Sequence, residues 1–343
     1  MTFLTQIIDM TDKQDFDALK KAADALAEGA LVAIPTETVY GLGANAFIPE
    51  SVREIFSVKG RPQDNPLIVH IDNLDMLSSV CEEVPDKALS VMEKFWPGPL
   101  TIIMKKHPSL PNEVTAGLDT VAVRMPSHKI ARLFISLAGV PVVAPSANTS
   151  GRPSPTKCEH VSEDFNGKIP YIIDGGACDI GLESTVLDLT GERALILRPG
   201  AVSLEQLREV LSDVEYDKGI IKDGVAPKSP GMKYKHYAPK AAMFIVEGEN
   251  SSQKIEELIL EHKNKGAKIG VIAMTDKPYD ADFIITLSDN PKDYAKGMFD
   301  ALRKFDSLGA DVILAETFKE TDGIKAAIKN RIYKSAGGKV ILC

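Results

Sequence analysis

The first 211 residues alternate short apolar runs with a few amphipathic stretches. Phe16, Leu19, Ala23 and Leu26 recur at helical spacing and predict a helix that ends near Gly29. The short apolar runs are typical of buried strands, and they lie at Leu31–Ile34, Leu67–Ile71, Leu100–Met104, Val121–Val123, Val140–Ala144, Tyr171–Ile173, Thr185–Leu189 and Leu195–Leu197. Further helices are expected at Ser51–Val58, Asp86–Phe95, Lys129–Leu137 and Leu204–Leu211. Many strands with few helices predict an α/β fold with one large, mixed and twisted sheet.

The pattern changes twice after residue 211. Between 212 and 240 it lapses into Gly, Pro, Lys and Tyr, including the string Ser229–Pro239, which cannot form a regular element. From 241 onward, expected strands at Ala242–Val246, Lys268–Met274, Phe283–Leu287 and Val312–Ala315 alternate with expected helices at Ile255–His262, Pro291–Leu308 and Ile324–Tyr333. We therefore expect a catalytic domain over 1–211, a linker over 212–240, and a small Rossmann-like parallel α/β domain over 241–343.

Composition and charge narrow the classes of function. The 343 residues are 44% hydrophobic and 26% charged, as in ordinary globular proteins. With 40 basic and 48 acidic residues the net charge is −8, which argues against a protein that coats nucleic acid through bulk charge. No stretch reaches the roughly 18 apolar residues of a membrane span, and the acidic start lacks a secretory leader. We expect a cytoplasmic protein without a membrane partner, in which an anionic ligand meets a local basic patch.

Two familiar kinds of site are not favoured. The cysteines Cys81, Cys158, Cys178 and Cys343 lie far apart without a CxxC pair, so neither a zinc cluster nor a disulfide framework is expected, and no protein metal site is predicted. Gly41–Ala46 fits the dinucleotide fingerprint G-x-G-x-x-A in letters only. Six residues separate it from the preceding strand and Pro49 delays the next helix, so a nicotinamide site is not favoured.

Basic residues stand at the ends of several predicted strands. Lys59 and Arg61 lie on a proline-bounded turn before Leu67–Ile71, although such a turn is often only a solvated surface. Arg124 and Arg198 each follow a buried apolar run directly. A desolvated guanidinium needs an anionic partner, which is either a ligand or an internal Asp or Glu. Both interpretations remain open from these residues alone.

Hydroxyl and amide side chains follow the strand that ends at Ala144. The string Pro145–Pro155 holds several of them between prolines, which suits hydrogen bonding to phosphate, ribose or a base edge, although Ser/Asn turns are also common structural features. Ser184 stands at a strand entrance and His70 closes another strand, where a lone histidine is often structural. Four cations and several hydroxyls at strand ends together predict a polyphosphate-binding cleft.

Several strings carry a resemblance to a known family: Pro35–Gly43, Lys59–Pro62, Asn65–Leu67, Trp96–Thr101, Val123–Pro126, Ala144–Asn148, Glu183–Val186 and Leu197–Gly200. Together they extend over about half of the chain. They resemble the threonylcarbamoyl-AMP synthases with a YrdC-like catalytic domain, and the string Ser229–Pro239 resembles the segment that marks the long two-domain form.

The resemblance implies a nucleotidyltransferase. ATP, L-threonine and bicarbonate or CO₂ would give L-threonylcarbamoyladenylate, pyrophosphate and water. A separate threonylcarbamoyl transferase would then place the group on adenosine 37 of tRNA. A carbamate oxygen attacks the α-phosphorus in this reaction, so the protein must supply alignment and positive charge rather than a covalent nucleophile. The lack of any Ser-His or Cys-His constellation in the sequence agrees with this chemistry.

The resemblance also implies a role for each matching residue. Lys59 and Arg61 are expected on the phosphates as the catalytic cations, and Arg124 on the carboxylate of threonine. The expected ATP-binding residues are Lys59, Arg61, Asn65, Thr120, Ser146, Asn148, Ser154, Arg198 and Tyr234, and the expected threonine-binding residues are Thr36, Thr38, His70, Arg124 and Ser184. Tyr234 and His236 are expected to form a lid from the linker. Mg²⁺ would arrive on the phosphates of ATP. We expect a monomer that binds tRNA weakly or not at all.

Two alternatives share the fold. One is an RNA-binding module, against which the acidic charge and the lack of Arg-rich or aromatic-interleaved tracts count. The other is an enzyme that forms carbamoyl-adenylate, as in hydrogenase maturation. The chain lacks the acylphosphatase and zinc-finger segments that accompany that activity.

Overall fold

The computed structural model describes residues 4–217 and 237–343. These residues form two compact units. The larger unit contains 4–150, 154–179 and 183–217, and the smaller contains 151–153, 180–182 and 237–343. Two short segments from within the predicted catalytic domain therefore belong to the smaller unit. One of them is held by Arg303, whose Nε and Nη2 donate to the carbonyl of Pro153 at 3.1 and 2.8 Å.

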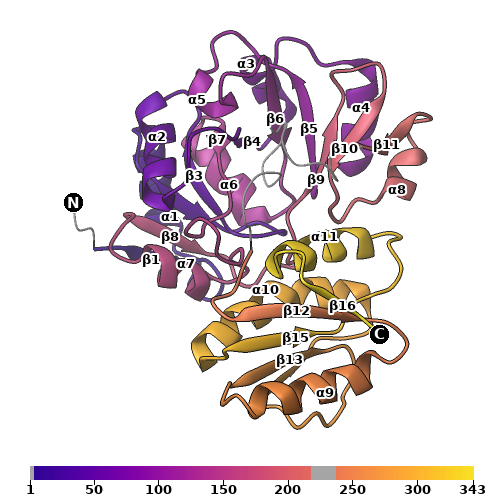
Figure 1. Ribbon diagram of the computed structural model, residues 1–343. Helices are drawn as coiled ribbons and strands as arrows, with labels where there is room; N and C mark the ends of the chain where they lie inside the picture. Colours follow the sequence, from indigo (N-terminus) through magenta and orange to yellow (C-terminus); the bar gives the residue numbers. More distant parts are fainter. Residues whose placement is uncertain (1–3, 218–236) are drawn as a thin grey trace. The chain divides into compact units, whose positions relative to one another are not determined.

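The larger unit is built on one mixed sheet (Figure 1). In the described residues the sheet has eleven strands in the order β1-β8-β2-β3-β7-β4-β6-β5-β9-β10-β11. The strands are β1 (Gln6–Asp9), β2 (Val32–Ile34), β3 (Gly41–Asn45), β4 (Ile68–His70), β5 (Leu100–Lys105), β6 (Thr120–Arg124), β7 (Val142–Val143), β8 (Tyr171–Asp174), β9 (Thr185–Asp188), β10 (Ala194–Arg198) and β11 (Val214–Tyr216). The sheet contains both parallel pairs, such as β4 with β6, and antiparallel pairs, such as β4 with β7, as expected for a mixed sheet.

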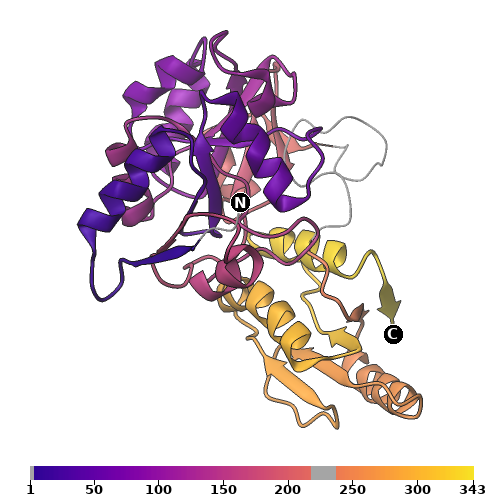
Figure 2. The same ribbon diagram turned by 90° about the vertical axis from the view of Figure 1, so that its left-hand side faces the viewer.

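Helices cover both faces of this sheet (Figures 1 and 2). The helices are α1 (Phe16–Ala27), α2 (Pro49–Lys59), α3 (Leu77–Val80), α4 (Asp86–Phe95), α5 (Asn112–Thr115), α6 (Lys129–Ala138), α7 (Cys158–Phe165) and α8 (Leu204–Arg208), with a 3₁₀ turn at Leu74–Met76. Helices α1 and α6 pack on one face with Val32 and Ile34, whereas α2, α4, α7 and α8 pack on the other with Leu31 and Ala33. Neighbouring strand residues thus point to opposite cores, which explains the continuous apolar runs.

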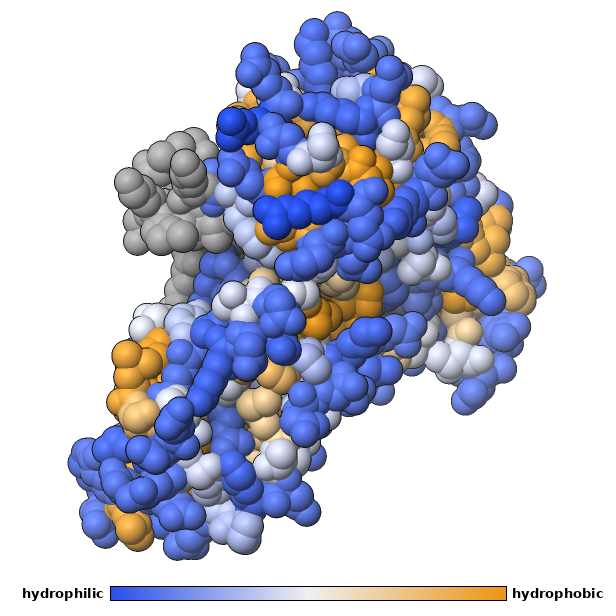
Figure 3. All heavy atoms as spheres, turned by 90° about the vertical axis from the view of Figure 1, so that its right-hand side faces the viewer, coloured by the Kyte–Doolittle hydropathy of each residue, from blue (hydrophilic) through white to orange (hydrophobic). Residues whose placement is uncertain are grey.

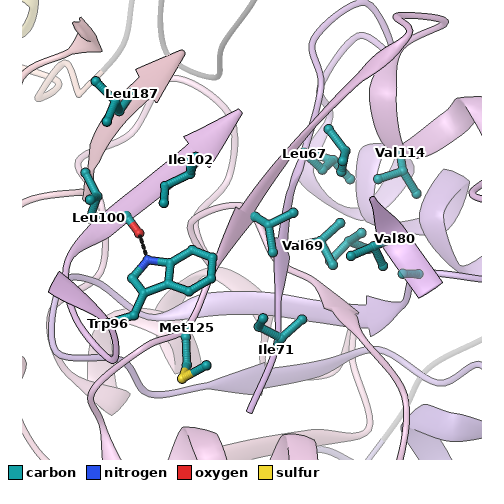
Figure 4. Close-up of a cluster of buried hydrophobic side chains, with 14 of the residues drawn as sticks. Leu67, Val69, Ile71, Val80, Trp96, Leu100, Ile102, Val114, Met125 and Leu187 are labelled. Atoms are coloured by element: carbon teal, nitrogen blue, oxygen red, sulfur yellow. Dashed lines mark hydrogen bonds between the residues drawn. The ribbon is translucent and has the colours of Figure 1, made fainter. Parts of the chain in front are cut away.

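The second of these cores surrounds Trp96 (Figure 4). Its indole N–H donates to the carbonyl of Leu100 at 2.7 Å, which satisfies the polar atom of an otherwise apolar side chain. The same core contains Val69 from β4, Ile71 directly after β4, and Ile102 from β5. Burying each such side chain stabilises the fold by about 1.5–3 kcal/mol, so this core holds rigid the strand ends that carry the polar residues described below.

Most predicted elements of the larger unit are present, but β1, β3, β11, α3, α5 and α7 were not predicted. The strand β3, which contains Gly41–Asn45, was not predicted because its glycines lack strand-forming side chains. A Cβ on Gly43 would lie 3.0 Å from Val142 Cγ1, so close packing favours glycine there. The segment is a strand and not the turn into a helix of a dinucleotide fingerprint. Helix α7 was also missed. The predicted linker began at residue 212, yet Val214–Tyr216 pair with β10 as β11.

The smaller unit is a parallel α/β fold, as predicted. In the described residues its strands lie in the order β14-β13-β15-β12-β16, and every neighbouring pair is parallel. The strands are β12 (Ala242–Glu247), β13 (Ile269–Ala273), β14 (Phe283–Thr286), β15 (Val312–Ala315) and β16 (Val340–Leu342). Helix α9 (Ser251–Lys263) covers one face, and α10 (Pro291–Leu308) and α11 (Lys325–Ser335) cover the other (Figure 1). This arrangement is Rossmann-like.

Figure 3 shows one face of the surface, coloured by hydropathy. This face is mostly hydrophilic, and its hydrophobic groups are interrupted by hydrophilic side chains. Among the residues that the structure describes, no helix combines the length and apolar character needed to cross a membrane.

Candidate active site

The loop Pro35–Tyr40 between β2 and β3 carries three buried polar side chains. Thr36, Glu37 and Thr38 are 2%, 4% and 0% exposed. The hydroxyl of Thr36 donates to the carbonyl of Val39 at 2.6 Å. Because that proton is used, Thr38 is the donor in the 2.8 Å hydrogen bond between the two threonine hydroxyls. The loop is therefore held in one conformation by its own side chains.

Arg124 ends β6 and is held by three groups. Its Nη1 donates to Thr38 Oγ1 at 2.8 Å, its Nε donates to the carbonyl of Gly98 at 3.3 Å, and its Nη2 lies 2.7 Å from Oε1 of Glu37. Of the two partners considered for this arginine, the internal carboxylate is present. A guanidinium has more N–H donors than these three contacts use, so donors remain for a carboxylate ligand.

The charges beside Arg124 have defined states. Burial is the largest single influence and raises the pKa of Glu37. The charge and hydrogen bonding of Arg124, together with the backbone amides of Glu37 and Ser127, lower it by more in total, so the pKa lies below its usual value and the carboxylate is ionised. His70 ends β4 and lies beside Arg124 in parallel register. Burial and then the charge of Arg124 lower the pKa of His70 to about 3, so its imidazole is neutral at neutral pH. We call Glu37, Thr38, His70 and Arg124 the arginine cluster.

Ser184 and Arg198 adjoin the arginine cluster through the sheet. The hydroxyl of Ser184 lies 2.7 Å from Oγ1 of Thr101. Ile102 pairs with Val123, which places Thr101 next to Arg124 across β5 and β6. Arg198 donates from Nη2 to Ser184 Oγ at 3.1 Å and from Nε to the Ser184 carbonyl at 3.0 Å. The structure thus joins Arg198, which was expected on ATP, to Ser184, which was expected on threonine.

A second group surrounds Lys59, the last residue of α2. Lys59 is 2% exposed, and its Nζ donates to the carbonyls of Ser146 at 2.5 Å and Asn148 at 2.6 Å. The amide of Ser150 donates back to the Lys59 carbonyl at 2.9 Å. This lysine therefore anchors the loop that follows β7 as well as placing a charge there. We call Lys59, Asn65, Ser146 and Asn148 the lysine cluster.

Asn65 has a buried amide that the described residues leave unsatisfied. It is 1% exposed, and neither Nδ2 nor Oδ1 has a hydrogen-bond partner among the described residues. Leaving a buried polar group unsatisfied costs about 1–3 kcal/mol. Strand β4 runs antiparallel to β7, so the end of β4 that follows Asn65 adjoins the end of β7 that leads to Ser146. An amide with no partner in the part of the chain that the structure describes is available to a bound molecule.

Register separates two of the expected ATP residues, Asn65 and Thr120, from two of the expected threonine residues, His70 and Arg124. Thr120 begins β6 and Arg124 ends it, so the two lie about 13 Å apart at ~3.3 Å per residue. Because β4 and β6 are parallel, Thr120 lies at the same end as Asn65, whereas His70 and Arg124 lie at the other end.

The loop Pro35–Tyr40 links the two clusters. Thr38 contacts Arg124, and a few residues later Gly41 forms an isolated bridge with Ser146 while the Ala147 amide donates to the Tyr40 carbonyl at 2.8 Å. One short, rigid segment therefore reaches both the arginine cluster and the lysine cluster.

The remaining expected residues differ in their surroundings. Arg61 is half-buried, with its guanidinium carbon 5.8 Å from the ring centre of Phe56. Ser154 is fully buried and donates to Oε1 of Glu183 at 2.6 Å, so its proton is already used. Tyr234 and His236 lie outside the described residues. Among the described residues, no group of three or more His, Cys, Asp or Glu could hold a metal ion.

Sequence reasoning missed Glu37, Thr101 and Glu183, which hold the expected site residues. Each belongs to or adjoins a string that was singled out, yet a lone Glu or Thr gives no sign of its partner. Only the requirement that Arg124 meet an anion pointed toward Glu37, and that requirement does not specify which carboxylate is near.

Two family models match the chain. Residues 24–200 match a model described as telomere recombination, and residues 202–337 match one described as the threonylcarbamoyl-AMP synthase C-terminal domain. The first model covers just over half of the chain.

Curated relatives and solved structures agree with these matches. The chain is 47% identical to the threonylcarbamoyl-AMP synthase of Pyrococcus abyssi, with 98% of this chain and 99% of the relative covered. It is 46% identical to that of Bacillus subtilis, with 97% and 98% covered. A crystal structure of P. abyssi Sua5 complexed with L-threonine superposes with a TM-score of 0.95 at 47% identity and covers 99% of this chain and 100% of that chain. The chain belongs to the threonylcarbamoyl-AMP synthase family, in the form that carries both matched domains.

Proposed function

We propose that this chain forms L-threonylcarbamoyladenylate and pyrophosphate from L-threonine, bicarbonate or CO₂, and ATP. The observation that carries the proposal is one loop, Pro35–Tyr40, that reaches both a fixed arginine and the loop after β7, which Lys59 anchors and near which an amide has no partner among the described residues. The first group fits an amino acid and the second fits a nucleotide. Relatives with the same two domains bear the corresponding name, and a crystal structure of P. abyssi Sua5 contains L-threonine.

On the threonine side, Arg124 would bind the α-carboxylate with the donors that its internal contacts leave over. Thr36, Thr38, His70 and Ser184 would line the rest of this pocket. Neutral His70 presents either a donor or an acceptor without adding a charge. Because Arg124 is held by Glu37, Thr38 and Gly98, it needs little reorganisation when the substrate enters.

On the ATP side, Lys59 and Arg61 would meet the phosphates, and the amide of Asn65 would gain the partners that the fold does not give it. Thr120, Ser146, Asn148, Ser154 and Arg198 would complete the nucleotide pocket. ATP would enter with Mg²⁺ on its phosphates, as a substrate rather than as a resident cofactor of the protein.

The chemistry needs alignment and charge. The threonine amine adds to CO₂ and loses a proton, which gives a carbamate. A carbamate oxygen then forms a bond to the α-phosphorus while the bond to the bridging oxygen breaks and pyrophosphate leaves. Lys59 and Arg61 would stabilise the negative charge that grows on the phosphoryl oxygens, and the rigid loop Pro35–Tyr40 would keep the two substrates in line. The product would pass to a separate threonylcarbamoyl transferase that acts on tRNA.

The proposal is tested by incubating the protein with ATP, labelled bicarbonate and single amino acids, and by measuring pyrophosphate and labelled adenylate. The expected result is release of pyrophosphate that requires both L-threonine and bicarbonate. Pyrophosphate release without threonine, or labelled product with no amino acid present, would contradict it. The second of these outcomes would favour the carbamoyl-adenylate alternative.

A further inference from the structure

The carboxylate of Glu37 is buried, and the described neighbours satisfy only part of the hydrogen-bonding capacity of its oxygens. Its side chain is 5% exposed, and Oε1 lies 2.7 Å from Arg124 Nη2. The amides of Glu37 and Ser127 lie near enough to favour the charged form. Neither carboxylate oxygen, however, accepts a hydrogen bond of normal geometry from the described residues. Buried carboxylates normally collect several such donors, so the unused acceptor capacity of Glu37 requires an explanation.

A charge argument supplies a second observation. Arg124 alone would make a buried positive site, which any small anion could occupy, including bicarbonate, phosphate or pyrophosphate. With Glu37 beside it, the pair has no net charge but has a positive and a negative end. Such a pair matches a molecule that is itself neutral overall and carries one charge of each sign, and an α-amino acid is such a zwitterion.

We propose that Glu37 makes the arginine cluster selective for an amino-acid zwitterion by accepting a hydrogen bond from the α-ammonium group while Arg124 binds the α-carboxylate. This inference rests on the proposed function, which places threonine at Arg124. The same carboxylate holds the guanidinium in place, so Glu37 acts in two ways. It positions Arg124, and it rejects ligands that have a carboxylate but no amine.

The test is direct binding, without turnover, of two ligands to the full chain. L-threonine and 3-hydroxybutyrate differ only in the amine, and calorimetry measures the affinity for each. For wild type we expect much tighter binding of threonine than of 3-hydroxybutyrate. Glu37→Gln, which keeps the shape but not the charge, should weaken threonine binding roughly tenfold or more, as for loss of a charge-assisted hydrogen bond. Its affinity for 3-hydroxybutyrate should be unchanged or higher.

Matched variants keep the test decisive. Glu37→Asp retains the charge and should keep most of the preference for threonine. Glu316→Gln removes a buried carboxylate of the smaller unit and should leave the affinities for both ligands as in wild type. ATP binding by each variant, measured in parallel, checks that the larger unit is folded. Equal threonine affinity in wild type and Glu37→Gln would overturn the inference, as would an equal loss for both ligands, which indicates a structural role only. If wild type bound neither ligand, both the threonine site of the proposed function and this inference would be wrong.

Discussion

Glu37 in the larger unit and Glu316 in the smaller unit are buried carboxylates that each follow a sheet strand closely. Residues of its own unit donate hydrogen bonds to both carboxylate oxygens of Glu316. Its Oε1 accepts from the Tyr279 hydroxyl at 2.7 Å and from Lys277 Nζ at 3.0 Å, and its Oε2 accepts from the Met274 amide at 2.7 Å. Glu37 has one charged partner and no hydrogen bond of normal geometry within the described residues.

The two carboxylates nevertheless have the same charge state. In both, burial raises the pKa and the surrounding partners lower it more, so both lie below the usual value for Glu. Neither burial, position at a strand end nor a lowered pKa separates a structural carboxylate from a functional one. What separates them is whether donors among the described residues satisfy the carboxylate oxygens.

The largest expected effect is at Lys59. Lys59→Ala should lower threonine-dependent pyrophosphate release by about two orders of magnitude or more, as for removal of a principal charge contact in the transition state. The change also removes the donor to the carbonyls of Ser146 and Asn148. Thermal unfolding of the variant therefore needs to be measured alongside turnover. A folded Lys59→Ala protein with a near-normal rate would show that the phosphates lie elsewhere.

Glu316→Gln should reduce stability without touching the site. Loss of the charge weakens the hydrogen bonds from Tyr279, Lys277 and the Met274 amide, for which we expect a cost of about 2 kcal/mol. The measurement is hydrogen exchange of the β12–β16 amides, which should become faster, while the KM for threonine stays unchanged. A raised KM for threonine would remove the distinction between the two carboxylates.

Asn65→Leu should weaken ATP binding without lowering the stability of the fold. Because the buried amide of Asn65 has no partner in residues 4–217 and 237–343, an apolar side chain of similar size should leave the free energy of unfolding unchanged or slightly higher. The affinity for ATP should fall about tenfold, because the hydrogen bonds that the amide makes to ATP are lost. Fluorescence of Trp96, the single tryptophan, reports unfolding of the larger unit. A variant that lost stability but bound ATP normally would show that the amide serves the fold.

The smallest expected effect concerns His70 and pH. Its pKa is about 3 in the folded chain, so it stays neutral there while the unfolded chain takes up a proton below about pH 6.5. The unfolded state binds more protons in this window, and stability should therefore fall as the pH is lowered, by about 1 kcal/mol between pH 6 and 5. In His70→Asn that contribution should vanish. An identical pH slope in wild type and variant would indicate that His70 is protonated in the fold.

The spacing of apolar residues along the chain predicted most of the helices and strands, because apolar runs such as Leu67–Ile71 must be buried wherever they occur. It did not predict β3, whose glycines are explained by the close approach of Ala144 to Gly41 and of Val142 and the Val32 carbonyl to Gly43. The same limit holds at the site. The sequence pointed to Arg124 as a residue in need of an anion, but its partners Glu37, Thr38 and Gly98 come from two distant loops that only the folded sheet brings together.

The central claim is that the larger unit binds an amino acid at the arginine cluster and a nucleoside triphosphate at the lysine cluster, and that the loop Pro35–Tyr40 connects the two. The most direct test is a crystal structure of the full chain with L-threonine and a non-hydrolysable ATP analogue. The account predicts the threonine carboxylate on Arg124, its ammonium beside Glu37, and the triphosphate beside Lys59 and Arg61 with the Asn65 amide bonded to the nucleotide. Threonine bound away from Arg124, or a triphosphate with no contact to Lys59 or Arg61, would contradict the account.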